Sequence, residues 1–367
     1  MNIKGIEIYP LKMKLKTPFV TSFSRVETKA VLAVKVTTAD GYVGWGEGVA
    51  FNDPSYTEET ATTTLHIMQQ FLVPLLIGKT LQHPDEVSEI LSPIRRNNMA
   101  KAAIECAVWD IYSQKQQMPL WQVLGGEKQT IEVGASIGIY EEESALFEVI
   151  ERRLQEGYKR IKVKIKPGKD VDVLRAIRKR FGAIPLMADA NSSYTLADLP
   201  VLKELDGFGL QMIEQPLAYN DFVQHAKLQN ELKTPICLDE SITSIADLET
   251  AVALGSCKVV NVKLARVGGL SEAKRIHDYG KQHGIQMWCG GMLEGGIGRA
   301  HAIALATLSE FVFPSDLGAS LNYWHRDIIQ PEVIVQNGEI QIPLTIGLGY
   351  RVDERYIRSE SAEKSHK

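Results

Sequence analysis

Five charged side chains recur in this sequence at nearly constant spacing. They are Lys164, Asp189, Glu214, Asp239 and Lys263, and consecutive members are 24 or 25 residues apart. Each one ends or follows a short apolar run, which is typical of a strand buried on both faces. One strand and one helix of a parallel barrel together take up about that many residues. The spacing therefore predicts five charges on neighbouring strands, at the rim where barrel active sites form.

The three acids in the middle of this series indicate a metal site. Asp189, Glu214 and Asp239 would repel one another at a common rim unless a cation stood between them. Carboxylate oxygens from separate strands suit Mg²⁺, which prefers hard oxygen ligands. We therefore expect a magnesium ion at these acids, and Mn²⁺ is expected to be able to replace it.

A lysine stands on either flank of the acids, which suggests proton transfer. Across a closed barrel, the ammonium groups of Lys164 and Lys263 would approach a bound ligand from opposite sides. A lysine acts as a general base only when its pKa falls toward neutrality, and burial, neighbouring cations and a metal ion all lower it. On the same strand, Lys162 and Lys166 share a face with Lys164, and Arg266 follows Lys263 closely.

Each of these features has a simpler interpretation when it is taken alone. The alternating lysines of residues 162–166 also fit a half-exposed strand with a solvated face. A single acid after a strand is commonly the cap of the next helix. The glycine-rich residues 290–298 are either a flexible turn or a set of backbone amides that bind an anion. Four histidines lie in helical patterns without metal spacing and are interpreted as structural or surface residues: His225, His277, His283 and His301.

Strands and helices alternate in the part of the chain that carries the five charges. The apolar runs predict eight strands, at residues 131–139, 160–166, 185–188, 210–213, 235–238, 259–262, 285–289 and 311–313. Amphipathic segments between them predict helices, including residues 142–156, 199–205, 245–254 and 271–283. Eight evenly spaced units favour a closed (β/α) barrel over an open doubly wound sheet.

The chain before this region has a different organisation. Two strand patterns flank an Asp40-Gly41 turn, which predicts a hairpin, and helical patterns follow at about residues 58–76 and 99–115. This is an α+β unit. After the last barrel strand, residues 333–349 return to short strand patterns, and residues 358–367 are expected to fray. The predicted divisions are residues 1–126, 127–322 and 323–367.

Composition excludes several functional classes. The 367 residues are 44% apolar and 23% charged, with a formal net charge of −4, which excludes a disordered chain and disfavours nucleic acid or anionic lipid as a partner. The four cysteines are far apart and form no zinc motif, so reduced core thiols are expected. The N-terminus lacks the apolar stretch of a signal peptide, and no apolar run approaches the roughly 20 residues of a membrane span. We therefore expect a cytoplasmic enzyme that acts on a small molecule.

The constellation resembles the enolase superfamily, and within it the muconate-lactonising-enzyme-like subgroup. The matching features are Lys-x-Lys at residues 162–164, the three acids on the next three strands, and Lys263 on the strand after them. The resemblance implies a modified TIM-like (β/α) barrel with an N-terminal α+β capping domain that the C-terminal segment completes. It also implies a magnesium-stabilised enediolate with a lysine base. Capping loops at residues 16–23 and 46–51 would close over the barrel mouth.

Several local strings are similar to the group that contains the o-succinylbenzoate synthases and N-succinylamino acid racemases. These strings are residues 15–19, 189–192, 213–216, 237–240, 266–269 and 290–294. The resemblance implies Lys164 and Lys263 as catalytic residues and the three acids as metal ligands. It places further residues around the substrate or behind these groups, namely Lys162, Asn191, Glu240, Ser136, Arg266, Gly291, Met292, Phe19 and Phe23. A homo-oligomer is also implied.

Two reactions remain open within this group. One is the dehydration of 2-succinyl-6-hydroxy-2,4-cyclohexadiene-1-carboxylate to o-succinylbenzoate in menaquinone biosynthesis. The other is racemisation of N-succinylamino acids, and one enzyme could perform both. Only one acid, Asp316, occurs in residues 314–318, where dipeptide epimerases carry a pair, so a substrate with an anionic succinyl end is favoured over one with a free amine. Backbone amides at Gly291 and Met292, with Ser136, are expected to hold that end. An inactive metal-binding scaffold is the alternative of a different class.

Overall fold

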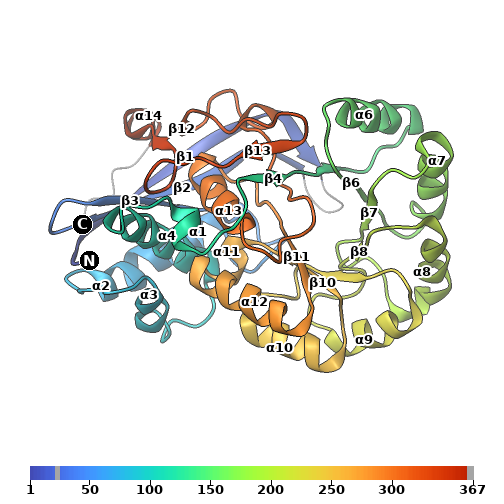
Figure 1. Ribbon diagram of the computed structural model, residues 1–367, viewed down its shortest axis with the longest axis horizontal. Helices are drawn as coiled ribbons and strands as arrows, with labels where there is room; N and C mark the ends of the chain where they lie inside the picture. Colours follow the sequence, from blue (N-terminus) through green and yellow to red (C-terminus); the bar gives the residue numbers. More distant parts are fainter. Residues whose placement is uncertain (21–24, 362–367) are drawn as a thin grey trace.

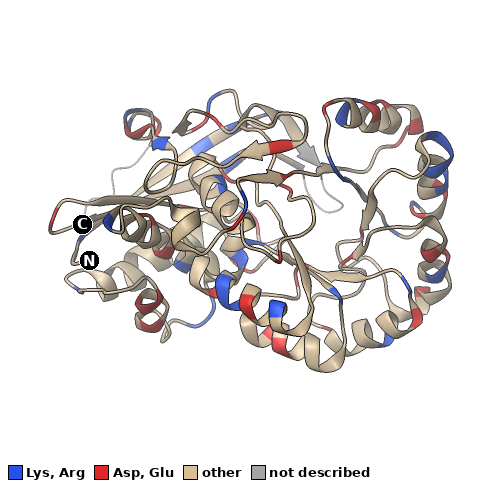
Figure 2. Ribbon diagram, in the orientation of Figure 1, with Lys and Arg blue, Asp and Glu red and all other residues tan. Residues whose placement is uncertain are grey.

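An N-terminal α+β unit lies beside a curled parallel sheet that is surrounded by helices (Figure 1). This computed structural model describes residues 1–20 and 25–361. The outer helices of the curled sheet carry most of the charged side chains in view, whereas the strands inside are largely uncharged (Figure 2). The predicted (β/α) barrel with an N-terminal capping domain is confirmed.

The capping unit is built on a three-stranded antiparallel sheet in the order β1-β2-β3. The strands are β1 (Ile3–Val20), β2 (Arg25–Thr38) and β3 (Val43–Gly48). The predicted hairpin at Asp40-Gly41 is confirmed, and Gly41 has the positive φ of +88° that such a turn requires. Residues 46–48 belong to β3 and not to a loop, which corrects one predicted boundary. Of the other predicted loop, residues 16–20 belong to β1, and residues 21–23 lie outside the described residues.

Helices pack on one face of this sheet because their apolar sides meet the alternating apolar residues of β1 and β2. The predicted helix at 58–76 is a nearly continuous helical segment with a π-type turn in its middle. Helix α4 is buried over most of its length and separates the sheet from the barrel. The helical elements are α1 (Ala61–Ile67), η1 (Met68–Leu72), α2 (Val73–Leu76), α3 (Asp85–Ile90), α4 (Asn98–Lys115) and α5 (Leu120–Val123).

The barrel strands follow one another in both sequence and space. All neighbouring pairs are parallel, and the sheet runs in the order β11-β10-β9-β8-β7-β6-β5. The strands are β5 (Ala135–Ile137), β6 (Ile161–Lys164), β7 (Leu186–Asp189), β8 (Ile213–Glu214), β9 (Ile236–Leu238), β10 (Val259–Val262) and β11 (Gln286–Cys289). Their residues are almost all buried, as expected of strands covered on both faces.

The predicted eighth strand closes the barrel through two isolated bridges. Phe311 pairs in parallel with Met287 of β11, and Ser315 pairs in parallel with Val133 at the start of the barrel. The predicted first strand at 131–139 is wrong in extent, because it consists of two short strands, β4 (Thr130–Glu132) and β5. Strand β4 pairs outside the barrel with β13 (Glu339–Gln341).

The four helices predicted between the strands agree closely with the structure. Most helices between the strands form the outer layer of the barrel in Figure 1 and bury one apolar side each, whereas the helices at residues 264–267 and 296–306 are buried over almost their whole length. The helices between the strands are α6 (Glu143–Gln155), α7 (Val171–Phe181), α8 (Leu199–Leu205), α9 (Phe222–Glu231), α10 (Ile245–Leu254), α11 (Leu264–Val267), α12 (Leu270–His283) and α13 (Gly296–Ala306). Short 3-10 turns complete this layer at η2 (Leu196–Asp198), η3 (Asp206–Phe208) and η4 (Ser320–Asn322).

The C-terminal segment returns to the capping sheet. Helix α14 (Glu354–Glu360) packs on β1, and its Glu354 forms an ion pair of 2.7 Å with Lys35 of β2. The remaining strands, β12 (Ile329–Gln330) and β14 (Arg351–Val352), pair with each other. The expectation that the chain frays from residue 358 is wrong for residues 358–360, which are helical. The divisions at residues 126 and 322 stay a prediction.

The cysteines and His301 have the structural roles that the sequence indicated. All four cysteines are free and buried. No helix in residues 1–20 or 25–361 is both long and apolar enough to cross a bilayer. His301 has a structural role, because its ring joins α13 to α4, with Nε2 at 3.0 Å from the carbonyl oxygen of Cys106.

The burial of His301 predicts a pH effect on stability. Burial disfavours the charged ring and lowers its pKa to about 4, although the carbonyl oxygens of Ile297 and Cys106 oppose this shift. An ordinary histidine titrates near 6.5, so the unfolded chain binds more protons than the folded protein between these two values. The stability that neutral His301 contributes is therefore complete above about pH 6.5, and it is lost as the pH falls toward about 4.

We expect the free energy of unfolding to fall by about 2 kcal/mol more in the wild-type protein than in His301→Gln between about pH 7.5 and about pH 5. Denaturant titrations of both proteins at the two pH values measure this difference. The same pH dependence in both proteins would contradict the assignment.

Candidate active site

A pocket opens at the carboxyl ends of the barrel strands, beneath the capping unit. The capping unit contributes side chains from the loop after β3, among them Phe51 and Tyr56. The barrel contributes the other lining residues, which are Ser136, Lys162, Lys164, Asp189, Asn191, Lys263, Gly291, Met292, Leu293, Glu294, Arg299, Asp316 and Tyr323. The site therefore lies between the two units, as a barrel-mouth site should.

The register of the barrel strands explains how residues 25 positions apart meet. Lys164 of β6 is paired with Asp189 of β7, and Asp189 is paired with Glu214 of β8. Glu214 is in turn paired with Cys237 of β9, two residues before Asp239. The carboxyl ends of parallel strands meet at one edge, so all of these side chains arrive at the same rim.

Lys164 binds the first acid of the series. Its Nζ lies 2.6 Å from Oδ2 of Asp189 and 2.5 Å from Oδ1 of Asn191. Asn191 in turn donates its amide to Glu240 at 3.0 Å. Burial and the neighbouring Asp239 carboxylate raise the pKa of Glu240 to about 7. Asn191 and Glu240 thus hold the Lys164 end of the site from behind.

Lys162 lies deeper in the barrel than Lys164. Its Nζ is 2.6 Å from Asp316, 3.1 Å from Glu214 and 3.5 Å from Asp189. Burial disfavours the ammonium group, but these three carboxylates outweigh burial and raise the pKa of Lys162 well above its ordinary value. Asp316 also accepts from the fully buried Arg160. Lys162 is therefore a fixed positive charge at the floor of the pocket.

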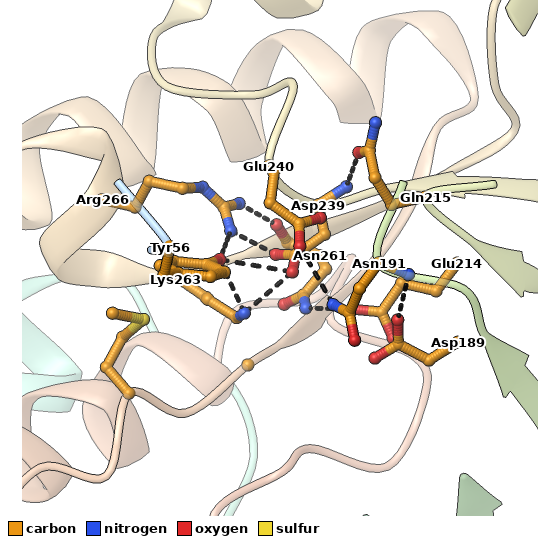
Figure 3. A network of polar contacts seen from close by, with 12 residues as sticks. Tyr56, Asp189, Asn191, Glu214, Gln215, Asp239, Glu240, Asn261, Lys263 and Arg266 are labelled. Atoms are coloured by element: carbon orange, nitrogen blue, oxygen red, sulfur yellow. Dashed lines mark hydrogen bonds and ion pairs between the residues drawn. The ribbon is translucent and has the colours of Figure 1, made fainter. Parts of the chain in front are cut away.

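Lys263 binds the last acid at the other end of the series. Its Nζ lies 2.8 Å from Oδ2 of Asp239 and donates to the Tyr56 hydroxyl at 2.7 Å. Arg266 binds the other oxygen of Asp239 and also donates to Tyr56 at 2.9 Å. Figure 3 shows Tyr56, Lys263 and Arg266 gathered on one side of Asp239, with Asn191, Glu214 and Asp189 on its other side.

The charges around Asp239 determine its ionisation. Burial opposes the ionised form, but Arg266 and Lys263 outweigh burial and hold the pKa of Asp239 far below its ordinary value. Burial likewise disfavours the Lys263 ammonium, and the Asp239 carboxylate overcomes this and raises the pKa of Lys263. In this arrangement Lys263 is a cation and Asp239 an anion.

Glu214 occupies the centre of the row of acids. It is fully buried and accepts from Asn261 of β10 at 2.8 Å. Burial and the nearby Asp189 carboxylate raise its pKa to about 8. Glu214 and Asp239 are not among the described lining residues of the pocket. Glu214 accepts from Lys162, and Asp239 accepts from Lys263.

The three acids supply hard oxygen donors from adjacent strands, which is the donor set that a divalent cation prefers. In the described part of the chain, no three acidic, histidine or cysteine side chains lie close enough together to hold a metal ion as they stand. Lys162, Lys164 and Lys263 form ion pairs with Glu214, Asp189 and Asp239, respectively.

The remaining predicted residues are found in different places. Ser136, Gly291 and Met292 line the pocket, whereas Glu240 and Arg266 support it from behind. Phe19 lies in β1, paired with Val26, and the structure describes only its backbone. Phe23 lies outside the described residues.

Sequence reasoning missed Tyr56, Asn261, Arg299 and Tyr323. Tyr56 and Tyr323 come from loops and carry no periodic signal. Asn261 was detectable in principle, because it is a polar residue inside an otherwise apolar strand run, Val259–Val262. Arg299 stands in the apolar helix α13, where a buried cation is equally conspicuous.

Comparisons with known proteins match both units. Residues 4–125 match the mandelate racemase / muconate lactonizing enzyme N-terminal domain, and residues 145–356 match the enolase C-terminal domain-like family. A relative from Geobacillus kaustophilus named o-succinylbenzoate synthase is 57% identical over 357 residues, covering 97% of this chain and 95% of the relative. An N-succinylamino acid racemase from Thermus thermophilus is 45% identical, covering 95% of this chain and 94% of the relative.

A solved structure of similar sequence gives the same result for the fold. An enolase superfamily member from Listeria innocua superimposes with a TM-score of 0.96 at 42% identity, covering 99% of this chain and 98% of that protein. The chain belongs to the enolase superfamily, in the muconate-lactonizing-enzyme-like group that includes the o-succinylbenzoate synthases and N-succinylamino acid racemases.

Proposed function

We propose that this protein is an o-succinylbenzoate synthase. It dehydrates 2-succinyl-6-hydroxy-2,4-cyclohexadiene-1-carboxylate in menaquinone biosynthesis. The observation that carries this proposal is one pocket lined by Lys164 and Lys263, with Asp189, Glu214 and Asp239 on the strands between them. The relative from Geobacillus kaustophilus supports the choice of reaction.

The proposed chemistry assigns one task to each lysine. The Lys164 amine takes the proton from the carbon next to the substrate carboxylate, and the electron pair moves into the carboxylate to form an enediolate. The carbon-oxygen bond of the ring hydroxyl then breaks, and the Lys164 ammonium returns its proton to the departing hydroxide, which leaves as water. Cationic Lys263 stabilises the enediolate charge between the two steps.

We propose that Asp189, Glu214 and Asp239 hold a magnesium ion, with Mn²⁺ able to replace it. When bound, a divalent ion supplies positive charge that stabilises the carboxylate oxygens as negative charge develops on them. The acids belong to adjacent strand ends and repel one another, which a cation of this charge relieves. Lys162 keeps its own carboxylate, Asp316, at 2.6 Å and is expected to stay beneath the site when the metal binds.

Nuclear magnetic resonance in D₂O tests the proposed reaction. The purified enzyme with Mg²⁺ is expected to convert the cyclohexadiene substrate to o-succinylbenzoate, with disappearance of the ring hydroxyl carbon signal. An unchanged substrate spectrum over the same period, with folded protein, would contradict the proposal.

Racemisation of N-succinylamino acids is the second candidate. It is favoured by the presence of a lysine at both ends of the row of acids, since racemisation needs a base on one face and an acid on the other. The racemase from Thermus thermophilus supports it. Exchange of the α-proton of N-succinylamino acids for deuterium tests this activity, and the synthase reaction alone would leave that proton in place.

Lys263→Ala is expected to lower kcat of dehydration by about 100-fold or more, because the enediolate loses its stabilising cation. The variant also leaves Asp239 with Arg266 as a partner, so the fold should be retained. Steady-state kinetics and a thermal melt measure both effects. A kcat within a fewfold of the wild-type value would contradict the role of Lys263.

We further propose that the enzyme is cytoplasmic and forms a homo-oligomer. Four free buried thiols fit a reducing compartment. Sedimentation velocity measures the oligomeric state.

A further inference from the structure

We infer that Arg299 binds the distal, succinyl carboxylate of the substrate and so selects substrates with an anionic tail. This inference rests on the proposed function. Arg299 belongs to α13 and lines the same pocket as Lys164 and Lys263, yet it is only 2% exposed. It is a cation placed at the pocket wall and shielded from bulk water.

The other three cations that line the pocket already have anionic partners. Lys162 binds Asp316 and Glu214, Lys164 binds Asp189, and Lys263 binds Asp239. Arg299 differs from all three. Within residues 1–20 and 25–361, no carboxylate oxygen is recorded within 4.0 Å of its guanidinium group, and its hydrogen-bond partners are neutral. They are the main-chain oxygen of Glu294 at 2.9 Å and the Ser320 hydroxyl at 3.5 Å.

A buried guanidinium group without an anion is unfavourable, and a bound carboxylate removes that penalty. The guanidinium group offers five donors in a planar fork that matches a carboxylate, and the two contacts above leave part of this fork unused. The ring of Tyr323, another lining residue, lies 4.9 Å from the guanidinium carbon and holds the group in place. The site is therefore organised before a ligand arrives.

One backbone amide of the glycine-rich loop is already occupied. The amide of Met292, expected from the sequence to hold the succinyl end, donates instead to the Glu294 carboxylate at 2.5 Å. A second anion at this amide would meet the charge of Glu294. Arg299 is thus the better receptor for an anionic tail, and the loop shapes the pocket next to it.

The substrate class follows from the arrangement of charges. One carboxylate of the ligand reacts between Lys164 and Lys263, and a second carboxylate, at the end of a short flexible chain, reaches Arg299. Both the succinyl-cyclohexadiene carboxylate and an N-succinylamino acid have these two groups. An N-acetylamino acid has only the first.

Equilibrium binding of two ligands tests the inference. The probes are o-succinylbenzoate and 2-butyrylbenzoate, in which a methyl group replaces the tail carboxylate, and titration calorimetry in the presence of Mg²⁺ gives both dissociation constants. We expect the wild-type protein to prefer o-succinylbenzoate by about 10- to 100-fold, as for hydrogen bonds to a charged group. Arg299→Gln should reduce this preference to within about threefold by weakening the binding of o-succinylbenzoate alone.

Two further variants separate ligand binding from a structural role. Arg299→Lys keeps the charge and should restore part of the preference, and it serves as the test if Arg299→Gln does not fold. Ser320→Ala removes a neutral partner of Arg299 but keeps the guanidinium charge, so it should lower the melting temperature and reduce the preference less than Arg299→Gln does. A structural role for Arg299 predicts that binding of both ligands falls equally in Arg299→Gln.

The inference would be overturned if Arg299→Gln still preferred o-succinylbenzoate as strongly as the wild-type protein does. It would also be overturned if an active wild-type enzyme showed no such preference. Either result would leave the proposed function intact. A wild-type protein that binds neither ligand and does not turn over the cyclohexadiene substrate would overturn both.

Discussion

Lys164→Ala is expected to lower kcat for dehydration by about 1,000-fold or more, at the upper end of what a single acid-base group contributes. The effect is large because this side chain both removes the α-proton and returns a proton to the leaving hydroxide in the proposed mechanism. Its Nζ is held by Asp189 and Asn191 at the pocket wall. The other two lysines that line the described pocket, Lys162 and Lys263, are held by Asp316 and Asp239 and cannot replace it. Stopped-flow or steady-state absorbance measurements give kcat.

The matched control is Lys166→Ala, two residues further along the same segment. Lys166 is partly exposed and is not among the described lining residues of the pocket, and its recorded partners are backbone contacts with Lys169. This control should retain nearly full activity. Comparable activity in Lys164→Ala and Lys166→Ala would contradict the assignment of the base.

Glu214→Gln is expected to weaken Mg²⁺ binding by more than about tenfold, because even residues that only support a metal ligand usually contribute that much. Activity at low Mg²⁺ should fall in parallel, and chelation should abolish the activity of the wild-type enzyme until Mg²⁺ is restored. Replacing the carboxylate also leaves Lys162 without one of its anionic partners, so the variant is expected to melt at a lower temperature.

Asp53→Asn provides the control for the metal prediction. Asp53 also lines the pocket, but it belongs to the capping loop and not to a barrel strand. Titration calorimetry with Mg²⁺ should find its affinity unchanged, while Glu214→Gln loses affinity. Undiminished Mg²⁺ binding by Glu214→Gln, with the enzyme folded, would exclude Glu214 as a ligand.

Much of the fold could be predicted from periodicity because barrel strands and helices are local units. The helices at residues 199–205 and 245–254 have the predicted bounds. The last strand was less well defined, since Phe311 and Ser315 pair through single bridges that have no pattern of their own. The split of residues 131–139 depends on pairing between β4 and β13, more than 200 residues later in the chain, which no local signal reveals.

The row of charges was predictable for a similar reason, because each residue occupies the same place in a repeated unit. The partners that surround the row were not predictable. Tyr56 reaches Lys263 and Arg266 from the capping unit, and only tertiary packing brings them together. The amide of Met292 was expected to be free, but Glu294, two residues away, occupies it. Such contacts depend on side-chain directions that sequence spacing does not specify.

The absorbance decay of 2-succinyl-6-hydroxy-2,4-cyclohexadiene-1-carboxylate, measured with the purified enzyme and Mg²⁺ beside a chelated control, tests the central claim most directly. We predict turnover with kcat/KM above about 10⁴ M⁻¹s⁻¹, in the range of efficient enzymes, and none in the chelated control. No decay with folded, magnesium-loaded protein would contradict the synthase assignment, and a decay that chelation leaves unchanged would contradict the role of the metal.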